Sequence, residues 1–212
     1  MNLSEIFYSI QGESTYAGLP CIFIRFSGCN LRCSYCDSKY SYETNFSLSV
    51  PEILKELEKY KPANIVEITG GEPLLQEKIY QLFDDLYFNG YKILLETNGS
   101  ISLEKVPDFV VKIVDIKCPA SNEEVSFYKG NIQYIHPQND NIKFVISNRA
   151  DYDWVMKRIE EYQIQDYNII LSCVFQYLEP RKLAAWILED KLYYRMQLQL
   201  QKYIWNPQKR RV

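Results

Sequence analysis

The chain has 212 residues, of which 47% are hydrophobic and 24% are charged, a composition that excludes a disordered protein. Its formal net charge of -3 gives no general attraction to nucleic acid or to an anionic membrane. No apolar run is long enough to span a bilayer and the N-terminus lacks the order of a signal peptide. We therefore expect one cytoplasmic domain, residues 1–212, without nucleic-acid or membrane partners.

Apolar, β-branched runs alternate with helical patterns along the chain. The predicted strands are residues 21–27, 64–69, 91–97, 110–116, 142–147, 167–173 and 194–203. The predicted helices, with apolar residues spaced by three and four, are residues 50–60, 75–89, 151–164 and 180–190. Residues 118–141 are polar and predict a loop. Continuous apolar strands separated by helices favour an α/β fold with a mainly parallel sheet covered by helices.

Unusual polar motifs follow the first four predicted strands. They are Gly28-Cys29, Gly70-Gly71-Glu72-Pro73, Glu96-Thr97-Asn98-Gly99 and Asp115-Ile116-Lys117. In a barrel of parallel strands, the carboxyl ends of the strands form the rim where active sites assemble. Strand-end loops are also polar for structural reasons, and Glu96 and Asp115 could equally be buried charges paired with Lys117.

Cysteine clustering is the sharpest signal in the sequence. Of six cysteines, Cys29, Cys33 and Cys36 lie within eight residues, and a reducing cytoplasm disfavours disulfides. Thiolates suit iron–sulfur clusters, zinc or copper(I), and three ligands would leave one iron of a four-iron cluster open. Packing on one helix face is an alternative, as is zinc, although zinc would need a fourth ligand and the sole histidine, His136, is distant in sequence.

The Cys-x3-Cys-x2-Cys spacing, with Tyr35 before the last cysteine, resembles the signature of the radical S-adenosylmethionine superfamily. The Gly70–Pro73 motif resembles the glycine-rich motif of the same superfamily. This resemblance implies a 4Fe-4S cluster on the three catalytic cysteines, whose open iron binds the amino and carboxyl groups of S-adenosylmethionine. An electron from the cluster would cleave this cofactor to methionine and a 5′-deoxyadenosyl radical, which abstracts a hydrogen atom.

Further motifs resemble the 7-carboxy-7-deazaguanine synthase family of queuosine and other deazapurine biosynthesis. They are residues 5–14, 18–20, 23–26, 28–33 and 36–38, then ETNG, Asp115-x-Lys117-x-Pro119, Lys143-Phe144-Val145 and Gln199-x-x-Lys202. The resemblance implies an abbreviated, partial (β/α) barrel with about six core parallel strands, as suits a chain of this length. It also implies ring contraction of 6-carboxy-5,6,7,8-tetrahydropterin with loss of ammonia, a catalytic Mg2+, a flavodoxin or ferredoxin as electron donor, and a homodimer.

The resemblance assigns roles to single residues. Substrate would be bound by Ile10, Gln11, Gly12, Glu13, Arg25, Thr69 and the C-terminal carboxylate of Val212. S-adenosylmethionine would be bound by Tyr35, Cys36, Asp37, Gly71, Glu72, Asn98, Asp115, Ile116 and Lys117. The hydroxyl of Ser38 would bind Mg2+.

Residue chemistry is compatible with these roles. Arg25 points to the strand face opposite its apolar neighbours and could clamp a carboxylate, although an ion-paired strand arginine is the alternative. Gln11 could read a pterin edge or belong to a turn built on Gly12. Ser38 supplies the kind of oxygen that Mg2+ binds, but Ser38 and Asp37 also favour capping a turn.

Three residues depart from the family pattern. Ser14 stands where glycine is common, Ser38 where threonine is common, and Gln201 where histidine is common. Two other functions remain open from the sequence. A radical-activating enzyme for a glycyl-radical protein uses the same cysteine loop, and a non-enzymatic module could hold structural zinc or a cluster.

Overall fold

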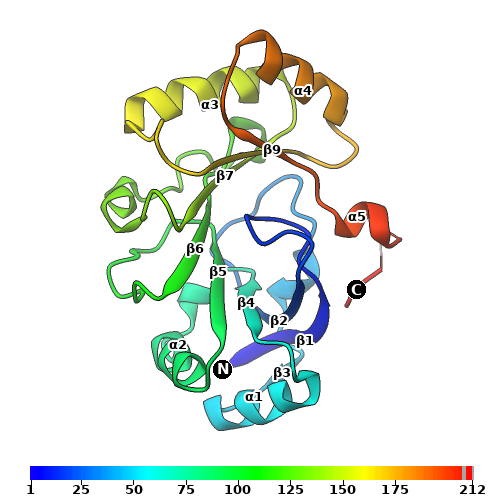
Figure 1. Cartoon of the computed structure of the whole chain (residues 1–212), viewed down its shortest axis with the longest axis vertical. Helices are drawn as coiled ribbons and strands as arrows, with labels where there is room; N and C mark the ends of the chain where they lie inside the picture. The colour runs from blue at the N-terminus through cyan, green and yellow to red at the C-terminus, as the bar shows by residue number, and fades with distance from the viewer. Residues whose placement is uncertain (207–208, 212) are drawn as a thin grey trace.

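The computed structural model describes residues 1–206 and 209–211. A nine-stranded sheet with the order β3-β1-β2-β4-β5-β6-β7-β8-β9 forms its centre (Figure 1). The strands are β1 Asn2–Ile10, β2 Pro20–Phe26, β3 Phe46–Ser47, β4 Ile65–Gly70, β5 Lys92–Thr97, β6 Val110–Asp115, β7 Asn141–Ile146, β8 Ile169–Cys173 and β9 Arg195–Gln197. From β2 through β9 each neighbouring pair is parallel, whereas β1 runs antiparallel to β2 and β3.

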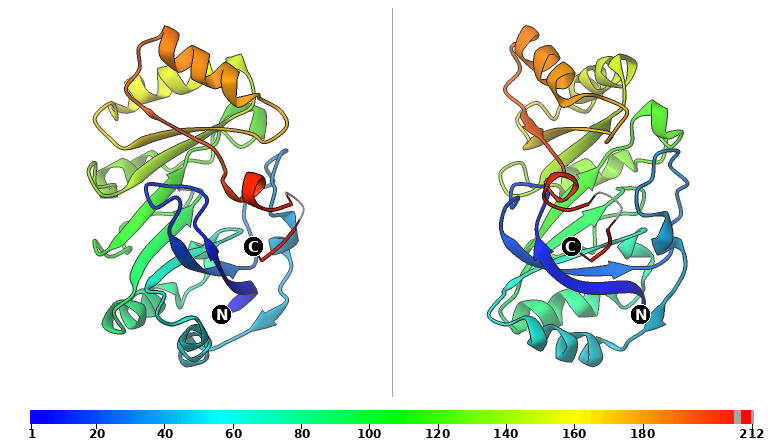
Figure 2. Two further views of the ribbon diagram at one scale, coloured as in Figure 1. Left: turned by 45° about the vertical axis from the view of Figure 1, so that its right-hand side comes forward. Right: turned by 90° about the vertical axis from the view of Figure 1, so that its right-hand side faces the viewer.

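Helices connect four of the successive pairs of parallel strands: α1 Val50–Leu57, α2 Ile79–Phe88, α3 Arg149–Tyr162 and α4 Pro180–Glu189. No α-helix lies in residues 98–109 or 116–140, between β5, β6 and β7, and the short α5 Gln201–Ile204 follows β9. Figure 2 shows α1 and α2 over one end of the sheet and α3 and α4 over the other. None of the helices in the described residues has both the length and the apolar character that crossing a membrane requires.

The two faces of β2 show how the sheet divides apolar from charged side chains. Ile24 and Phe26 are fully buried in the large core beneath the helices. The alternate residues point into the barrel, where Cys21 and Phe23 form a small apolar cluster near the start of the strand. Arg25 follows them near the carboxyl end and faces a cavity. The predicted orientation of Arg25, opposite to its apolar neighbours, is therefore correct.

Two strand predictions are wrong. The sequence analysis missed β1, because it mixes polar and apolar residues without strict alternation. The predicted strand 194–203 ends at Gln197 and is followed by α5. Since β9 has only β8 as a neighbour, the chain beyond Gln197 is free to leave the sheet. The predicted loop 118–141 is irregular, apart from 3-10 turns, up to the start of β7 at Asn141.

The loop between β1 and β2 closes the open side of the barrel. The amide of Leu200 donates to the Gly12 carbonyl at 3.1 Å, and the amide of Thr15 donates to Asn141 Oδ1 at 2.9 Å. Gly12 also lets the side chain of Gln201 approach the loop, because a Cβ at position 12 would lie 1.7 Å from Gln201 Oε1 and would displace that side chain. This loop thus joins the beginning of the sheet to its last strands.

Candidate active site

A cavity of about 740 Å³ opens at the carboxyl ends of the parallel strands. Its size is within the range of small-molecule sites. It is lined by most residues that the sequence analysis singled out: Ile10, Gln11, Gly12, Glu13, Arg25, Cys29, Cys33, Tyr35, Cys36, Asp37, Ser38, Thr69, Gly71, Asn98, Asp115 and Lys117. A smaller cavity of about 300 Å³ adjoins it and shares Phe175, Gln176, Tyr177 and Gln199 with it. The large cavity is the candidate site because it gathers the titratable side chains.

The cysteine loop between β2 and the 3-10 turn Lys39–Tyr42 is irregular, so packing on one helix face is excluded. All three thiols are partly exposed and line the cavity. Burial, together with the neighbouring Cys36 thiol, raises the pKa of Cys29. The same two causes raise the pKa of Cys33 to about 11. Bound iron would have to displace these protons, since the ligand is the thiolate.

The thiols fit a cluster better than they fit a closed single-ion site. Within residues 1–206 and 209–211, no three histidine, cysteine or acidic side chains converge on one point as ligands of a single ion would. Each thiolate of a four-iron cluster binds a different iron, so the three sulfur atoms need not meet.

Close backbone contact joins the cysteine loop to the glycine-rich turn. The amide of Glu72 donates to the Gly28 carbonyl at 2.9 Å, and that of Gly71 donates to the Phe26 carbonyl at 3.2 Å. A Cβ on Gly71 would lie 2.1 Å from the Gly28 carbonyl oxygen, so glycine is required there.

Glu72 does not line the cavity, contrary to its predicted role as a cofactor contact. It is fully buried, and its carboxylate accepts hydrogen bonds from the Leu74 amide at 3.0 Å, the Thr97 hydroxyl at 2.9 Å and the Asn98 amide at 2.8 Å. Both oxygens are therefore used, and Glu72 ties the end of β4 to the end of β5. The side chain of Ile116, also predicted as a cofactor contact, is fully buried in the core under the helices, which leaves only its backbone for that role.

Asn98 links the end of β5 to the cysteine loop. Its side-chain amide donates to Asn30 Oδ1 at 3.2 Å and lies 4.0 Å from Cys29 Sγ. Farther along the rim, Lys117 binds Asp115 Oδ2 at 2.8 Å. Asp115 Oδ1 is buried without a hydrogen-bond partner in the described part of the chain, so it is an acceptor on the cavity wall for the amino or hydroxyl groups of a ligand.

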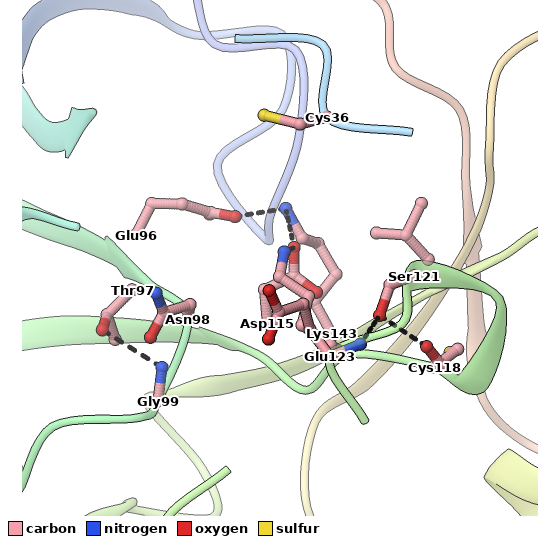
Figure 3. Close-up of polar contacts among 12 residues, drawn as sticks. Cys36, Glu96, Thr97, Asn98, Gly99, Asp115, Cys118, Ser121, Glu123 and Lys143 are labelled. Carbon is pink, nitrogen blue, oxygen red and sulfur yellow. Dashed lines mark hydrogen bonds and ion pairs between the residues drawn. The ribbon is translucent and has the colours of Figure 1, made fainter. Parts of the chain in front are cut away.

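Lys143 contacts three acidic residues of the cavity, Glu13, Glu96 and Asp115, of which the last two are labelled with it in Figure 3. Its ammonium contacts Glu96, lies 3.1 Å from Glu13 Oε2 and lies 3.8 Å from Asp115 Oδ2. Glu96 therefore pairs with Lys143, and the prediction that it might pair with Lys117 is wrong, whereas Asp115 does contact Lys117. Lys143 is 5% exposed, so these contacts replace its lost hydration.

The carboxyl groups around Lys143 differ in protonation. Burial raises the pKa of Glu96 to about 7, although Lys143 opposes this shift. Burial also acts on Glu13, but Lys143 and hydrogen bonds from Gln201 and Gln199 outweigh it and lower the pKa to about 2. Burial, with Glu96 and Glu13 nearby, raises the pKa of Glu67 well above its usual value. Of Glu13, Glu67 and Glu96, Glu13 is thus the one whose pKa most favours the carboxylate at neutral pH.

Arg25 is both ion-paired and turned toward the cavity. Its Nε donates to Glu5 Oε1 at 2.8 Å, and the Tyr40 hydroxyl donates to the same oxygen at 2.9 Å. These contacts fix the guanidinium, and its terminal nitrogens have no hydrogen-bond partner within residues 1–206 and 209–211. The tail crosses nearby, with Arg210 stacked over the Tyr40 ring at 4.0 Å, whereas Val212 lies outside the described residues.

The side chain of Gln11 takes part in the turn around Gly12, whereas the side chain of Ser38 does not cap the turn that follows it. Gln11 donates to Glu67 and accepts the Glu13 amide at 2.9 Å, so Glu67 fixes the orientation of its amide. Ser38 precedes the 3-10 turn, but its hydroxyl makes no capping hydrogen bond and lies 3.8 Å from Cys36 Sγ. The capping role considered for Ser38 is therefore wrong.

The sequence analysis missed several residues of this site. Glu67, Lys143, Glu5, Tyr40, Gln197 and Gln199 received no individual role. A signal existed for two features: Glu67 is an ionisable residue inside an apolar strand, and Gln197, Gln199 and Gln201 alternate along one side of the chain. Glu5 and Tyr40 carried no comparable pattern.

Comparisons with known proteins agree with this geometry. The family model for the radical SAM superfamily matches residues 23–177. The chain is 44% identical to a 7-carboxy-7-deazaguanine synthase of Koribacter versatilis, with 98% of both chains covered, and 43% identical to one of Chlorobaculum tepidum, covering 100% of this chain and 97% of the relative. The crystal structure of QueE from Escherichia coli superposes with a TM-score of 0.78 at 21% identity, covering 93% of each chain. This last likeness supports the predicted partial-barrel fold.

Proposed function

Because this chain belongs to the radical SAM superfamily and, within it, to the 7-carboxy-7-deazaguanine synthases, we propose that it contracts the ring of 6-carboxy-5,6,7,8-tetrahydropterin to 7-carboxy-7-deazaguanine and releases ammonia. The reaction would serve queuosine or another deazapurine pathway. The observation that carries the proposal is the joining of Cys29, Cys33 and Cys36 in one cavity with Arg25 and the carboxyl groups around Lys143. The full-length likeness gives no support to a glycyl-radical activase or a zinc module.

The cysteine side of the cavity fits the cofactors. Cys29, Cys33 and Cys36 would hold three irons of a 4Fe-4S cluster, and Gly71 offers a backbone that a ligand can approach closely. The unpartnered Asp115 Oδ1 would accept a hydrogen bond from S-adenosylmethionine. When bound, the cluster and S-adenosylmethionine supply the radical that removes a hydrogen atom from the substrate.

The opposite side fits the carboxypterin. The terminal nitrogens of Arg25, held in place through Glu5, can donate two parallel hydrogen bonds to the substrate carboxylate. Glu13 and Gln11 present acceptors and a fixed amide to the aminopyrimidine edge of the ring. Since its pKa is about 7, a carboxylate oxygen of Glu96 can hold or release a proton near neutral pH, as loss of ammonia requires.

The test is anaerobic turnover. Protein reconstituted with iron and sulfide should hold about four irons per chain and convert the carboxypterin with one ammonia released for each product molecule. Cofactor cleavage without any 7-carboxy-7-deazaguanine would contradict the proposed substrate while leaving the superfamily assignment intact.

We also propose that Ser38 binds the catalytic Mg2+. Its hydroxyl lines the cavity and is not used as a cap, and Mg2+ needs only one or two protein oxygens when substrate and water supply the others. Ser38→Ala should lose most of the stimulation by Mg2+ but keep the cluster and cofactor cleavage. Ser38→Thr keeps the hydroxyl and should keep the stimulation. Equal magnesium titrations of wild type and Ser38→Ala would remove Ser38 from the metal site.

The family likeness further supports a flavodoxin or ferredoxin as electron donor and a homodimer of one-domain chains. Light scattering of the reconstituted protein tests the dimer. Replacement of a chemical reductant by each purified donor tests the electron-transfer partner.

A further inference from the structure

Ser14 has an unusual backbone conformation for a buried residue. Six residues other than glycine have a positive φ in the described chain: Ser14, Asn122, Gln163, Gln176, Lys191 and Arg211. The last five are exposed, whereas Ser14, at φ 64°, is 1% exposed. The left-handed region disfavours residues that carry a Cβ, so surrounding contacts must hold Ser14 in it.

The side chain of Gln197 provides these contacts. The Ser14 amide donates to Gln197 Oε1 at 2.6 Å, and Gln197 Nε2 donates to the Ser14 carbonyl at 2.7 Å. One side-chain amide thus binds both backbone polar groups of one residue. Gln197 is 8% exposed and lies on β9, which is hydrogen-bonded to β8, so the amide is anchored to the sheet.

Gln197 differs from the two other glutamines of its alternating series. Gln199 and Gln201 donate to Glu13 Oε1 at 3.0 and 2.9 Å, and both line the large cavity. Gln197 lines the smaller adjoining cavity and not the large one, and both of its side-chain hydrogen bonds are to the backbone of Ser14. These hydrogen bonds connect Gln197 to a ligand of the large cavity through Ser14.

The loop that Gln197 holds carries Gln11 and Glu13, which line the cavity and lie three positions and one position before Ser14. A change of φ at Ser14 would swing the preceding segment, because one backbone torsion redirects the chain on both sides of it. Glycine at position 14 would adopt a positive φ without steric cost, so the loop would depend less on the side-chain amide of Gln197.

We propose that Gln197 is a positioning residue for the substrate: by holding Ser14 in the left-handed conformation, it sets Gln11 and Glu13 against the ring of the carboxypterin. The inference rests on the proposed function of the loop in substrate binding. It makes Ser14 and Gln197 one functional unit, in which the Gln197 amide offsets the conformational cost of a positive φ at a serine.

A double-mutant cycle tests the unit. Gln197→Leu keeps the approximate side-chain size but removes both hydrogen bonds. In the reconstituted enzyme it should raise KM for 6-carboxytetrahydropterin roughly tenfold, with a small change in kcat and no change in cofactor cleavage without substrate. Ser14→Gly alone should change KM less than about threefold, and the double variant should return to within about threefold of wild type. Gln133→Leu, an exposed glutamine outside both cavities, is the matched control and should change nothing.

The pair of hydrogen bonds from Gln197 to Ser14 is called the clamp. Hydrogen exchange on the chain without cofactors distinguishes failure of the clamp from failure of the proposed function. The amides of Gln11 and Gly18, which close the loop onto Leu19 and Gln11 at 2.8 Å each, should exchange faster in Gln197→Leu and recover in the double variant. Unchanged exchange and unchanged KM in Gln197→Leu would overturn the proposal, as would a raised KM that Ser14→Gly does not rescue. The third outcome concerns the substrate. If Gln197→Leu speeds the exchange of these amides, Ser14→Gly restores it, and the wild-type protein does not convert the carboxypterin, the proposed substrate is wrong but the clamp is supported. If Gln197→Leu does not fold, recovery of folding by Ser14→Gly supports the clamp and its failure contradicts it.

Discussion

The two sides of the cavity are built by different means. The cysteine side, formed by residues 28–42, 70–72 and 97–100, is joined by backbone contacts such as that between Glu72 and Gly28 and by hydrogen bonds of the Glu72 and Asn98 side chains. The hairpin side, formed by residues 11–16, Lys143 and residues 197–201, is joined by side-chain amides and charges. Bound metal and cofactor would complete the first side, whereas the second is assembled by the protein alone. Substitutions on the cysteine side should therefore reduce binding of the cluster and cofactor, whereas substitutions on the hairpin side should change the stability or the local structure of the protein.

The largest expected effect comes from removing a cluster ligand. Cys33→Ala should abolish both the cluster and turnover, because an iron would lose its only protein ligand. Cys118→Ala, which removes a fully buried core thiol, should keep the cluster. Iron and sulfide counts after anaerobic reconstitution measure this effect. Full iron content in Cys33→Ala would show that Cys33 is not a ligand of the cluster.

On the hairpin side, Lys143→Met should destabilise the fold itself. It leaves Glu13 and Glu96 buried without their cation, at a cost of roughly 3 kcal/mol in the free energy of unfolding at pH 7.5. The cost should shrink at pH 5, where the carboxyl groups can take up protons. Urea unfolding of the cofactor-free protein at both pH values measures it, and a loss that does not depend on pH would exclude the charge explanation.

Arg25→Ala should weaken substrate use more than it weakens the fold. Loss of a fixed partner for the substrate carboxylate is expected to lower kcat/KM by an amount equivalent to about 2–4 kcal/mol of transition-state stabilisation. Cofactor cleavage without substrate should persist. Arg149→Ala, which breaks an exposed pair with Asp153, is the control. Unchanged turnover in Arg25→Ala would make the Glu5 pair purely structural.

The smallest predicted effect is a change in the pH dependence of stability. The pKa of Glu96 is about 7 in the fold against 4.5 ordinarily, so the folded state binds the extra proton and loses stability as pH rises from 4.5 to 7. Glu13 has the opposite shift, to about 2, and acts only below pH 4.5. Glu96→Gln should therefore reduce the loss between pH 5 and 7.5 by about 2 kcal/mol. Parallel stability curves for variant and wild type would contradict this.

The same contrast explains what the sequence could predict. The cysteine side is encoded in short motifs, so Cys29, Cys33, Cys36 and Gly71 were found directly from spacing and resemblance. The parallel strands were found because their apolar runs are continuous. The hairpin side joins residues far apart in sequence, and no local pattern links Glu13 to Lys143 or Ser14 to Gln197.

Errors in the sequence analysis have similar physical causes. Glu72 lies in a cofactor motif, but its carboxylate is consumed by Thr97 and Asn98, which only the tertiary structure reveals. The strand predicted over 194–203 had a correct alternation of glutamines. It ends at Gln197, and beyond it the backbone bonds to the hairpin loop, where the Leu200 amide donates to the Gly12 carbonyl.

Contact between residues 12–14 and 197–201 also determines when the site can form during synthesis. Glu13 and Gln201 are 188 positions apart, and Ser14 and Gln197 are 183 apart. Domains gain their long-range contacts only as the later segments leave the ribosome. A nascent chain that has emerged through Asn98 already carries the three cysteines and the glycine-rich turn, yet its hairpin loop has no partners. The ability to take up iron can thus precede the ability to recognise a pterin, and the last strand to be translated completes the enzyme.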